Sequence, residues 1–403
     1  MRVCLIAHRF YEGNSHMMQF ANALARRGDK VDVISLRAKG MSKREVVDGV
    51  NVYRIQARTI DEKGPISYLW KILLFELRAA VLLAWLHLRN RYQLIHVQSV
   101  PDFLVFVAML PKLLGTPVIL DLRDLVPELY ASKFRVNPKS LVIRVLLRLE
   151  KVSVRFADHV IIANPIWRDR IIKRSAKAEH CTMFWYYPDP EVFHRRAQPT
   201  RNRRFLIIYP GTLNWHQGVD IAVRAFPKVL QQVPDAEFHI YGQGPEKDAI
   251  IRLVAQLKLT DKVKLFDSVP VKEIAEVMAS SDVGIVPKRA SCLFGNEAAS
   301  TKIADFMAIG VPVVASRTRV ESCFYDDTLL HYFRSEDEDD LANSVAEIYK
   351  NPNLNTHLVE NAARYVEQNR WDVRMGEYLR LVDRLVYPEQ KGNVEALAAK
   401  RGR

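Results

Sequence analysis

The residues best suited to chemistry lie in one stretch, GNEAASTKIADFMAIGVPVVAS at 295–316. Its pattern predicts a loop, a helix that ends before Gly310, and then a strand. A helix start offers free N–H groups and the positive end of the helix dipole, which suit a diphosphate. Lys302 falls in the first turn, where a cation is unfavourable for the helix, so an anionic ligand would explain it better. Ser300 or Thr301 can cap this helix, and an ordinary capped helix with surface charges fits the same spacing.

Two acidic residues flank the helix start. Glu297 precedes it, and Asp305 lies one turn after Thr301, where a carboxylate can accept hydrogen bonds from sugar hydroxyls. This Glu, seven residues, a second acid and then FMAIGVPVV (306–314) resemble the donor-binding segment of glycosyltransferase family 4. The resemblance implies that the first acid contacts the donor sugar and the second holds the ribose. The family has Glu at the second place, whereas Asp305 is one methylene shorter. The STK form of the loop resembles a subgroup of the family.

A second segment, YPGTLNWHQGVDIAVRAF (209–226), is similar to the first strand, loop and helix of the family's C-terminal domain. Gly211 and Thr212 lie in its loop. The Arg and Lys with which the family clamps the diphosphate would fall at Thr212 and Gln217, so both cations are absent. Lys302 would then have to supply the positive charge, and Lys288 and Arg289 in VPKRAS (286–291) are further candidates.

Two more segments complete the donor side. FHIYGQGPEKDAI (238–250) matches a strand followed by Gly-x-Gly, in which Gly242 and Gly244 would let the backbone approach a nucleotide closely. Alone this motif is weak, because turns use it often. VKLFDSVPVKEI is similar to the segment that cradles the base, near Val269 and Pro270. Four such segments in the family's order, within about 110 residues, are far more specific than any one of them.

The N-terminal half resembles the family as well, with larger departures. HRFYEGNSHMMQFANALARRGDKVDVIS (8–35) is similar to its first strand, glycine loop and helix. Gly13, Asn14 and His16 would then lie on the acceptor side. His96 lies near the end of the expected strand LIHVQ, where it can reach a cleft or serve as a structural residue of the sheet.

VILDLRDLVPELYASKF (118–134) resembles a family segment in which a His–Asp pair ends a strand, with the His beside the reacting sugar. Here the pair is Arg123–Asp124. Arginine cannot accept a proton, but it can stabilise a departing phosphate or bind an anionic acceptor. An Arg123–Asp124 ion pair that only orders the loop is the alternative. Asp124 and Glu128 are candidates for orienting an acceptor hydroxyl.

The elements that must position these residues are short β-branched runs alternating with longer amphipathic stretches. Six runs of the first half are predicted as strands: 3–7, 31–36, 51–56, 94–98, 117–122 and 159–163. Five more follow residue 204: 205–209, 236–241, 263–266, 282–287 and 311–316. Apolar strands alternating with helices predict an α/β fold with parallel sheets covered on both faces. We therefore expect two Rossmann-like domains facing across a cleft, the GT-B arrangement of the family, with ligands at the carboxyl ends of the strands.

The length of 403 residues suits two domains better than one core. We expect a Rossmann-like acceptor-binding domain at 1–195 and a nucleotide-sugar donor-binding domain at 205–370. A C-terminal helix at 372–387 would pack back on the first domain. The polar, basic run RRAQPTRNRR (195–204) is the best linker candidate, and 391–403 reads as a loose basic tail.

The charge is divided unequally between the two halves. Residues 1–195 hold 31 Lys and Arg against 18 Asp and Glu, whereas the remainder holds 28 of each. A basic half can face anionic lipid, a phosphorylated substrate or nucleic acid. Nucleic acid is the weakest of the three, because no zinc-finger spacing, RNP-type aromatic pattern or basic zipper is present. The four scattered cysteines argue against a zinc site or disulfide framework and fit a reducing cytosol.

Two apolar stretches bear on membranes. YLWKILLFELRAAVLLAWLHL (68–88) is strongly apolar, but Lys71, Glu76 and Arg78 interrupt it, so we expect a buried or interfacial helix and not a membrane span. SLVIRVLLRLEKVSVRF (140–156) carries basic residues at helical spacing. It fits a core helix with a solvated basic face, or contact with an anionic membrane surface.

The combined expectation is a cytoplasmic enzyme with peripheral contact at the inner face of the membrane. It would move a hexosyl residue from a nucleoside-diphosphate sugar to a saccharide or lipid-linked acceptor in cell-surface polysaccharide or glycoconjugate synthesis. The resemblance implies retention at the anomeric carbon. No cofactor and no essential metal are expected, since no metal-binding pair of aspartates stands out. A sugar-nucleotide epimerase on the same fold and a non-catalytic binding protein are the alternatives, the latter because the usual His, Arg and Lys are missing.

Overall fold

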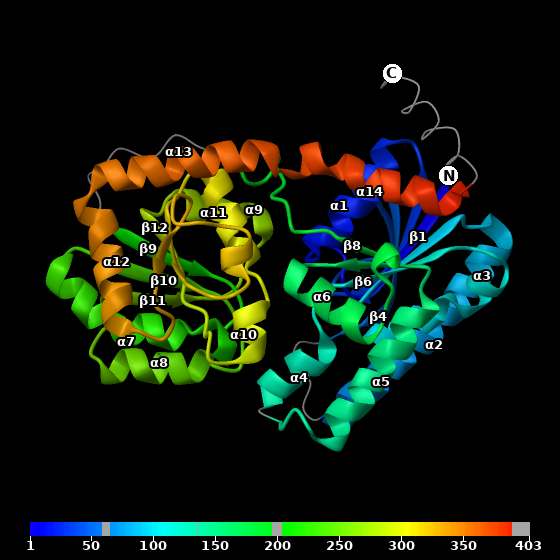
Figure 1. Ribbon diagram of the computed structural model, residues 1–403, viewed down its shortest axis with the longest axis horizontal. Coiled ribbons are helices and arrows are strands. Elements are labelled where there is room, and N and C mark those ends of the chain that lie inside the picture. The colour runs from blue at the N-terminus through cyan, green and yellow to red at the C-terminus, as the bar shows by residue number, and fades with distance from the viewer. Residues whose placement is uncertain (59–64, 135, 196–203, 389–403) are drawn as a thin grey trace. The chain divides into compact units, whose positions relative to one another are not determined.

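The computed structural model describes residues 1–58, 65–134, 136–195 and 204–388. Most of the predicted linker and the whole predicted C-terminal tail lie outside these residues. The chain forms two compact units (Figure 1). Unit 1 contains Met1–Pro127, Leu141–Trp185 and the segment from Arg374 onward. Unit 2 contains Glu128–Ser140 and Tyr186–Val373.

Unit 1 is built on a sheet with the strand order β3-β4-β2-β1-β5-β6-β7-β8. All neighbours are parallel except β3 and β4, which form an antiparallel edge. The six predicted strands are all present, and the short edge strands β3 and β8 were not predicted. The strands of unit 1 are β1 (Arg2–Phe10), β2 (Lys30–Arg37), β3 (Arg44–Val47), β4 (Val50–Ala57), β5 (Leu94–Gln98), β6 (Val118–Leu122), β7 (His159–Ile162) and β8 (Cys181–Met183).

Helices flank this sheet, as crossovers between parallel strands require (Figure 1). They begin where the sequence supplies caps: Asn14 accepts the Met17 N–H at the start of α1, and Asn164 accepts the Trp167 N–H at the start of α6. Helix α14, near the C-terminal end of the described residues, also packs on this unit, and its Tyr378 contacts His96 there. The helices are α1 (Ser15–Arg26), α2 (Pro65–Asn90), the 3-10 helix η1 (Asp102–Ala108), α3 (Met109–Leu113), α5 (Leu141–Phe156), α6 (Pro165–Arg174) and α14 (Trp371–Val386), which belongs to this unit from Arg374 onward. A further helix, α4 (Val126–Phe134), belongs to unit 2 from Glu128 onward.

Unit 2 has a fully parallel sheet with the order β11-β10-β9-β12-β13-β14. Five of its strands were predicted, and the three-residue β14 was not. The strands are β9 (Leu206–Pro210), β10 (Glu237–Tyr241), β11 (Val263–Phe266), β12 (Val283–Val286), β13 (Val313–Ser316) and β14 (His331–Phe333). Successive residues point to opposite faces, so Ile207 and Ile208 of β9 belong to two different buried clusters. The sheet is therefore covered on both sides.

The helices of unit 2 that matter for the site are short. α10 (Leu293–Glu297) and α11 (Thr301–Ile309) lie between β12 and β13. Gly310 ends α11 in the left-handed conformation, with φ of 84°, as predicted. Of the two candidate caps, Ser300 occupies the N-cap position, but its side chain makes no capping hydrogen bond. The other helices are α7 (Val219–Gln232), α8 (Lys247–Gln256), α9 (Val271–Ala279), α12 (Glu338–Lys350) and α13 (Pro352–Gln368).

The apolar stretch at 68–88 lies within α2. Its buried side chains include Ile72, Phe75 and Leu83, which join the core of unit 1. Within the described residues, no helix combines the length and the apolar character needed to cross a membrane.

Candidate functional site

The start of α11 carries a lysine in an unfavourable electrostatic environment. Nζ of Lys302 lies 3.5 Å from Oε1 of Gln217 and 5.2 Å from the ring centre of Tyr209. No carboxylate forms an ion pair with it among the residues that the structure describes. Burial, with a further contribution from Lys288, lowers its pKa to about 8. An anion bound here would relieve this unfavourable environment.

Three glycines shape the loops around this lysine. Gly211 has φ of 150°, and a β-carbon on it would lie 2.1 Å from Cε of Lys302. A β-carbon on Gly242 would lie 1.9 Å from the carbonyl oxygen of Gly211, and one on Gly244 would lie 2.3 Å from that of Leu213. The Gly211 N–H also donates to the carbonyl of Tyr241. The loops after β9 and β10 thus pack closely against each other. This packing alone explains why positions 242 and 244 are glycines, whether or not they also contact a nucleotide.

A buried ion pair holds the segment that leads into α11. The Glu321 carboxylate accepts from the Ser300 N–H at 2.9 Å and from Nζ of Lys288 at 3.1 Å. Lys288 also donates to the carbonyl of Ala298. Both charged side chains are buried. The Ser300 hydroxyl oxygen, also buried, has no hydrogen-bond partner among the described residues, so it can serve a ligand at the helix start.

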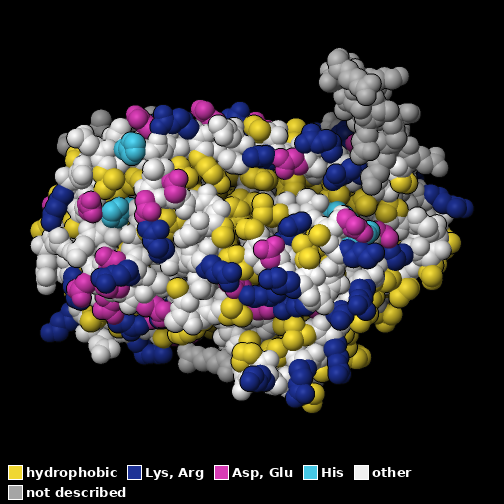
Figure 2. Space-filling view, viewed as in Figure 1, with side chains coloured by type: hydrophobic (Ala, Val, Ile, Leu, Met, Phe, Trp, Pro, Cys, Tyr) yellow, Lys and Arg dark blue, Asp and Glu magenta, His cyan; other side chains and the backbone are white. Residues whose placement is uncertain are grey.

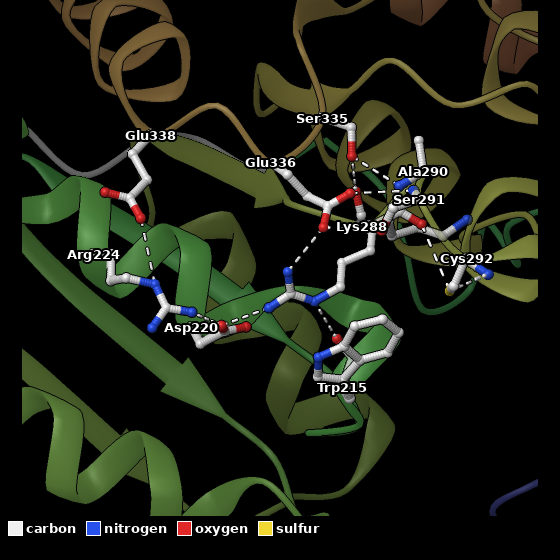
Figure 3. Close-up of polar contacts among 12 residues, drawn as sticks. Trp215, Asp220, Arg224, Lys288, Ala290, Ser291, Cys292, Ser335, Glu336 and Glu338 are labelled. Atoms are coloured by element: carbon white, nitrogen blue, oxygen red, sulfur yellow. Dashed lines mark hydrogen bonds and ion pairs between the residues drawn. The ribbon is translucent and has the colours of Figure 1, made fainter. Parts of the chain in front are cut away.

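The Arg289 guanidinium is fully engaged within unit 2, and Figure 3 labels its partners Trp215, Asp220 and Glu336. It pairs with Asp220 at 2.5 Å and with Glu336 at 3.1 Å, and it donates to the carbonyl of Trp215. Lys288 and Arg289, the further candidates for the positive charge, therefore each already have a carboxylate partner. Lys302 remains as the cation of this loop cluster.

The two predicted acids lie in different surroundings. Glu297 ends α10, is buried, and has Oε1 3.5 Å from Nη1 of Arg319. Asp305 is also buried, and its Oδ1 accepts a hydrogen bond of 2.7 Å from the hydroxyl of Tyr186. Burial raises the pKa of Asp305 to about 7, although Tyr186 and Lys302 oppose the shift. Tyr186 thus already occupies one hydrogen-bonding position of the carboxylate that was predicted to hold a ribose.

The positions where the family has its clamping cations carry uncharged groups. Thr212 is exposed, and its carbonyl accepts from the Tyr209 hydroxyl at 2.8 Å. Gln217 lies in the 3-10 turn Trp215–Gln217, beside Lys302. The neighbouring His216 is buried, and burial together with Lys288 and Lys302 lowers its pKa to about 4. It is therefore a neutral ring at physiological pH.

The two residues that we expected beside the nucleotide base lie in the connection between β11 and α9. Val269 is partly buried, and Pro270 is exposed at the N-cap of α9. Nearby, the rings of Tyr241 and Phe266 stack with centres 4.5 Å apart at the carboxyl ends of β10 and β11. Sequence reasoning missed this aromatic pair, whose signal is an aromatic residue at the end of each of two adjacent strands.

In unit 1, Arg123 makes a two-pronged ion pair with Asp121. Its Nε donates to Oδ2 at 2.8 Å, and its Nη2 lies 2.7 Å from Oδ1. Asp124 instead lies 3.6 Å from Arg9. The proposed Arg123–Asp124 pair is therefore wrong. Residues two apart in an extended chain point to the same side, whereas adjacent residues point to opposite sides.

A polar chain extends from this pair to the glycine loop. Nη1 of Arg123 lies 2.9 Å from Nδ1 of His16, which accepts the hydrogen bond, and burial with the Arg123 charge lowers the pKa of His16 well below its usual value. Asn14 caps α1 and donates to Gln98 at 2.5 Å, and Gln98 donates to Asp121. Asn14 thus has a structural role, and a β-carbon on Gly13 would contact nothing within 4 Å.

His96 lies inside unit 1. It is 1% exposed, its Nδ1 is 2.9 Å from the hydroxyl of Tyr378 on α14, and its Nε2 is 3.7 Å from Asp121. The ring of Phe20 packs beside it. Of the two roles that the sequence allowed for His96, the structure supports the structural one, because the buried side chain is not accessible to an acceptor substrate.

No metal centre is evident in the described part of the chain: none of its His, Cys, Asp and Glu residues cluster in threes that could hold an ion. The arrangement offers instead a cation, a helix start and a buried hydroxyl in unit 2, and an arginine–histidine pair in unit 1.

Comparison with known proteins identifies the family. Residues 13–185 match the family described as glycosyl transferase 4-like domain, and residues 191–365 match glycosyl transferases group 1. The chain belongs to the family 4 glycosyltransferases of the GT-B fold. Among curated family members, a phosphatidylinositol N-acetylglucosaminyltransferase subunit of Homo sapiens is 22% identical over 80% of this chain and 65% of its own length. An uncharacterized glycosyltransferase of Methanocaldococcus jannaschii is 22% identical over 89% of this chain and 90% of its own length. The chain therefore spans just under two thirds of the human relative.

Solved GT-B structures have the same fold. Sucrose-phosphate synthase from Thermosynechococcus elongatus superposes with a TM-score of 0.77 at 19% identity, covering 95% of this chain and 99% of that one. The Anabaena protein HepE in complex with UDP and glucose superposes with a TM-score of 0.69 at 16% identity, covering 94% and 99%. At these identities the likeness concerns the fold.

Proposed function

We propose that this protein transfers a hexosyl residue from a nucleoside-diphosphate sugar to a saccharide or lipid-linked acceptor, in the synthesis of a cell-surface polysaccharide or glycoconjugate. Residues 205–370 would bind the donor, and residues 1–195 would bind the acceptor. The observation that carries the proposal is Lys302, a partly buried cation at a helix start with no carboxylate partner among the described residues. A diphosphate supplies the charge that this environment lacks.

The groups at the start of α11 suit the stabilisation of a departing diphosphate. Lys302 and the N–H groups of the first helical turn would bind its oxygens, and the Ser300 hydroxyl would donate to it. Each such fixed donor can contribute roughly 3–4 kcal/mol where charge develops. The Glu321–Lys288 pair keeps this segment in place before the donor binds, so little reorganisation is needed.

We propose that the remaining donor contacts follow the family pattern. Glu297 would accept hydrogen bonds from hydroxyls of the sugar. Asp305 would bind the ribose through the hydrogen-bonding positions of its carboxylate that Tyr186 does not occupy. Gly211, Thr212, Gly242 and Gly244 would contribute backbone groups, and Val269 and Pro270 would border the base. We expect retention at the anomeric carbon, as in the family.

On the acceptor side, Arg123 would bind an anionic group of the acceptor. Its pairing with Asp121 holds the guanidinium in one orientation, while Nη1 reaches His16. Asp124 would orient the acceptor hydroxyl. Burial raises its pKa, which Arg9 and Arg123 oppose, so its basicity is greater than that of an ordinary aspartate. A group of higher pKa accepts a proton more readily as the hydroxyl attacks.

The names of relatives support a lipid-linked acceptor. The human relative is named for transfer to phosphatidylinositol. A Mycolicibacterium smegmatis relative, 28% identical over 33% of this chain and 35% of its own length, is named a GDP-mannose-dependent phosphatidylinositol monomannoside mannosyltransferase. We place the protein in the cytoplasm with peripheral contact at the inner face of the membrane. We also propose that no metal is essential, so activity should survive EDTA.

The test is a thermal-shift screen of nucleotide sugars, followed by transfer assays with the donor that stabilises most. Lys302→Ala should weaken donor binding, and Glu297→Ala should abolish transfer with the fold intact. Lys350→Ala, at an exposed position of α12, is the matched control. Full activity in both site variants would overturn the site. A wild-type protein that binds a donor but neither transfers nor slowly hydrolyses it would be a binding protein.

A further inference from the structure

Helix α2 has a second apolar face that its own unit does not cover. Apart from the adjacent Leu69 and Trp70, its side chains lie three or four residues apart, so they form one continuous stripe along the helix. Each is at least 44% exposed: Leu69, Trp70, Leu73, Leu77, Val81, Trp85 and Leu88. Scattered exposed hydrophobic residues are normal, but a continuous stripe of this length that includes two tryptophans marks an interaction surface.

A groove runs beside this stripe, between α2 and the β3–β4 edge. Its volume is about 990 Å³. Leu77, Val81 and Trp85 of the stripe form its apolar wall. The opposite wall is cationic, with Arg37, Lys43, Arg44 and Arg54 from the strands and the connection to β3, joined by Arg78 from α2. No acidic residue is among the described residues that line it.

Most of these cations have no carboxylate partner among the described residues. Arg54 is the exception, since it pairs with both Glu12 and Glu45, and these three side chains together keep one negative charge. Arg44 lies over the ring of Tyr53 at 4.9 Å, and Arg78 donates to the side-chain oxygen of Gln56. Arg37 and Lys43 have no side-chain partner in the described chain. Among the described residues, the five cations of the groove and the two carboxylates paired with Arg54 thus leave a net charge of +3, 5 − 2, beside an apolar wall.

We propose that this groove binds the anionic headgroup of a phospholipid, and that the α2 stripe enters the adjoining bilayer surface. A ligand that fits must carry negative charge next to hydrocarbon, because cations and aliphatic side chains share the groove. Tryptophan favours the interface of a bilayer, where Trp70 and Trp85 would lie. A second copy of the chain is a poor occupant, since residues 1–195 carry a net charge of +13 and would repel their like.

Neighbouring helices extend the same surface. α2 packs against η1 and α3, and α5 packs against η1. On α5, Val142, Val145 and Val152 are exposed among basic side chains. Figure 2 shows yellow and dark-blue side chains side by side along the edge of unit 1 where Figure 1 draws α2, α3 and α5. This mixture of apolar and basic residues suits an anionic bilayer surface.

The site belongs to unit 1, and its test does not depend on sugar transfer. The experiment is flotation of the full-length protein with vesicles of phosphatidylcholine alone or mixed with phosphatidylglycerol. Binding is expected to the mixed vesicles, with a blue shift of tryptophan fluorescence. The triple variant Arg37→Glu, Lys43→Glu, Arg44→Glu should bind at least about 100-fold more weakly, since each basic residue near an anionic surface contributes roughly a factor of five. Trp70→Ser with Trp85→Ser should also weaken binding and abolish the fluorescence shift.

The matched control reverses three exposed charges of unit 2, by Arg252→Glu, Lys258→Glu and Lys272→Glu. It has the same net charge as the groove variant and should retain most of the binding. Circular dichroism and thermal melting check that every variant folds. Equal loss in the groove and control variants, or equal binding to both kinds of vesicle, would overturn the proposal. So would a concentration-dependent dimer that Leu77→Glu dissociates, since a second copy would then cover the stripe.

Discussion

A β-carbon at position 211 would lie 2.1 Å from Cε of Lys302, so the lysine side chain passes through the space that a side chain at position 211 would fill. Gly211 precedes the lysine by 91 residues in the chain, and it lies at the end of β9, while Lys302 lies in the first turn of α11. The position where the family has a cation carries Gln217 instead, and Lys302 lies beside it. Lys302 therefore brings a positive charge to the same loop from a different element.

Gly211→Ala should displace the Lys302 side chain and weaken donor binding at least about tenfold, equivalent to about 1.4 kcal/mol. The φ of 150° adds strain for any residue with a β-carbon. Calorimetric titration with the donor measures the affinity. Gly13→Ala is the matched control, because a β-carbon there meets nothing within 4 Å. Unchanged affinity in Gly211→Ala would show that the lysine does not contact the donor.

Donor binding should become weaker as the pH rises above 8. The pKa of Lys302 is lowered to about 8 in the unbound protein, and a bound diphosphate should raise it, so binding takes up a proton in this range. The dissociation constant should increase by up to about tenfold per pH unit between pH 8 and 9.5. Titrations in buffers of different ionisation enthalpy measure the proton uptake. Lys302→Met should bind weakly with no such dependence, and a dependence that persists in this variant would assign it to another group.

Asp305→Asn should stabilise the protein at pH 8 but not at pH 4. Burial raises the carboxyl pKa to about 7, so the folded state holds a proton that the unfolded state has lost between about pH 4 and 7. The wild-type free energy of unfolding therefore falls as the pH rises through this window, by up to about 4 kcal/mol from this group. Asparagine keeps an oxygen for the Tyr186 hydroxyl and carries no charge. Urea denaturation of both proteins at the two pH values provides the test, and an equal difference at both would contradict it.

Glu321→Gln should destabilise unit 2 by about 3–5 kcal/mol, because it leaves the buried Lys288 without its counter-charge. The Ser300 N–H can still donate to the amide oxygen, so the loss reflects the charge and not the backbone contact. Chemical denaturation measures the change. Asp327→Asn is the control, since it breaks an exposed pair with Arg317 that should contribute little. Similar stability of the two variants would refute the role assigned to the buried pair.

Local patterns in the sequence predicted most of the architecture. The strands from Arg2–Phe10 to Val313–Ser316 followed from apolar runs, and the end of α11 followed from Gly310. The strands that were missed, including β3 and β14, are at most four residues long and lie at sheet edges, where fewer residues need to be apolar. Helix α10 was missed for a similar reason, since five residues carry too short a periodic signal.

The sequence could not predict which residues far apart in the chain contact one another. The pairing of Arg123 with Asp121 depends on which side each strand residue faces, and Tyr186 meets Asp305 across 119 positions. The sequence offered Lys288 and Arg289 as further candidates beside Lys302, and only the fold showed that Glu321, Asp220 and Glu336 pair with them.

The sequence alone determined the α/β class and the order of the elements, because periodicity and glycine positions act over a few neighbours. Its resemblance to the family also indicated the segment in which we propose the donor site. Only the tertiary structure decided which charges remain uncompensated among the residues it describes: Lys302 at the helix start, and the cations beside the α2 stripe. Charge compensation depends on distances of a few ångströms between residues far apart in the chain, and no local pattern encodes them.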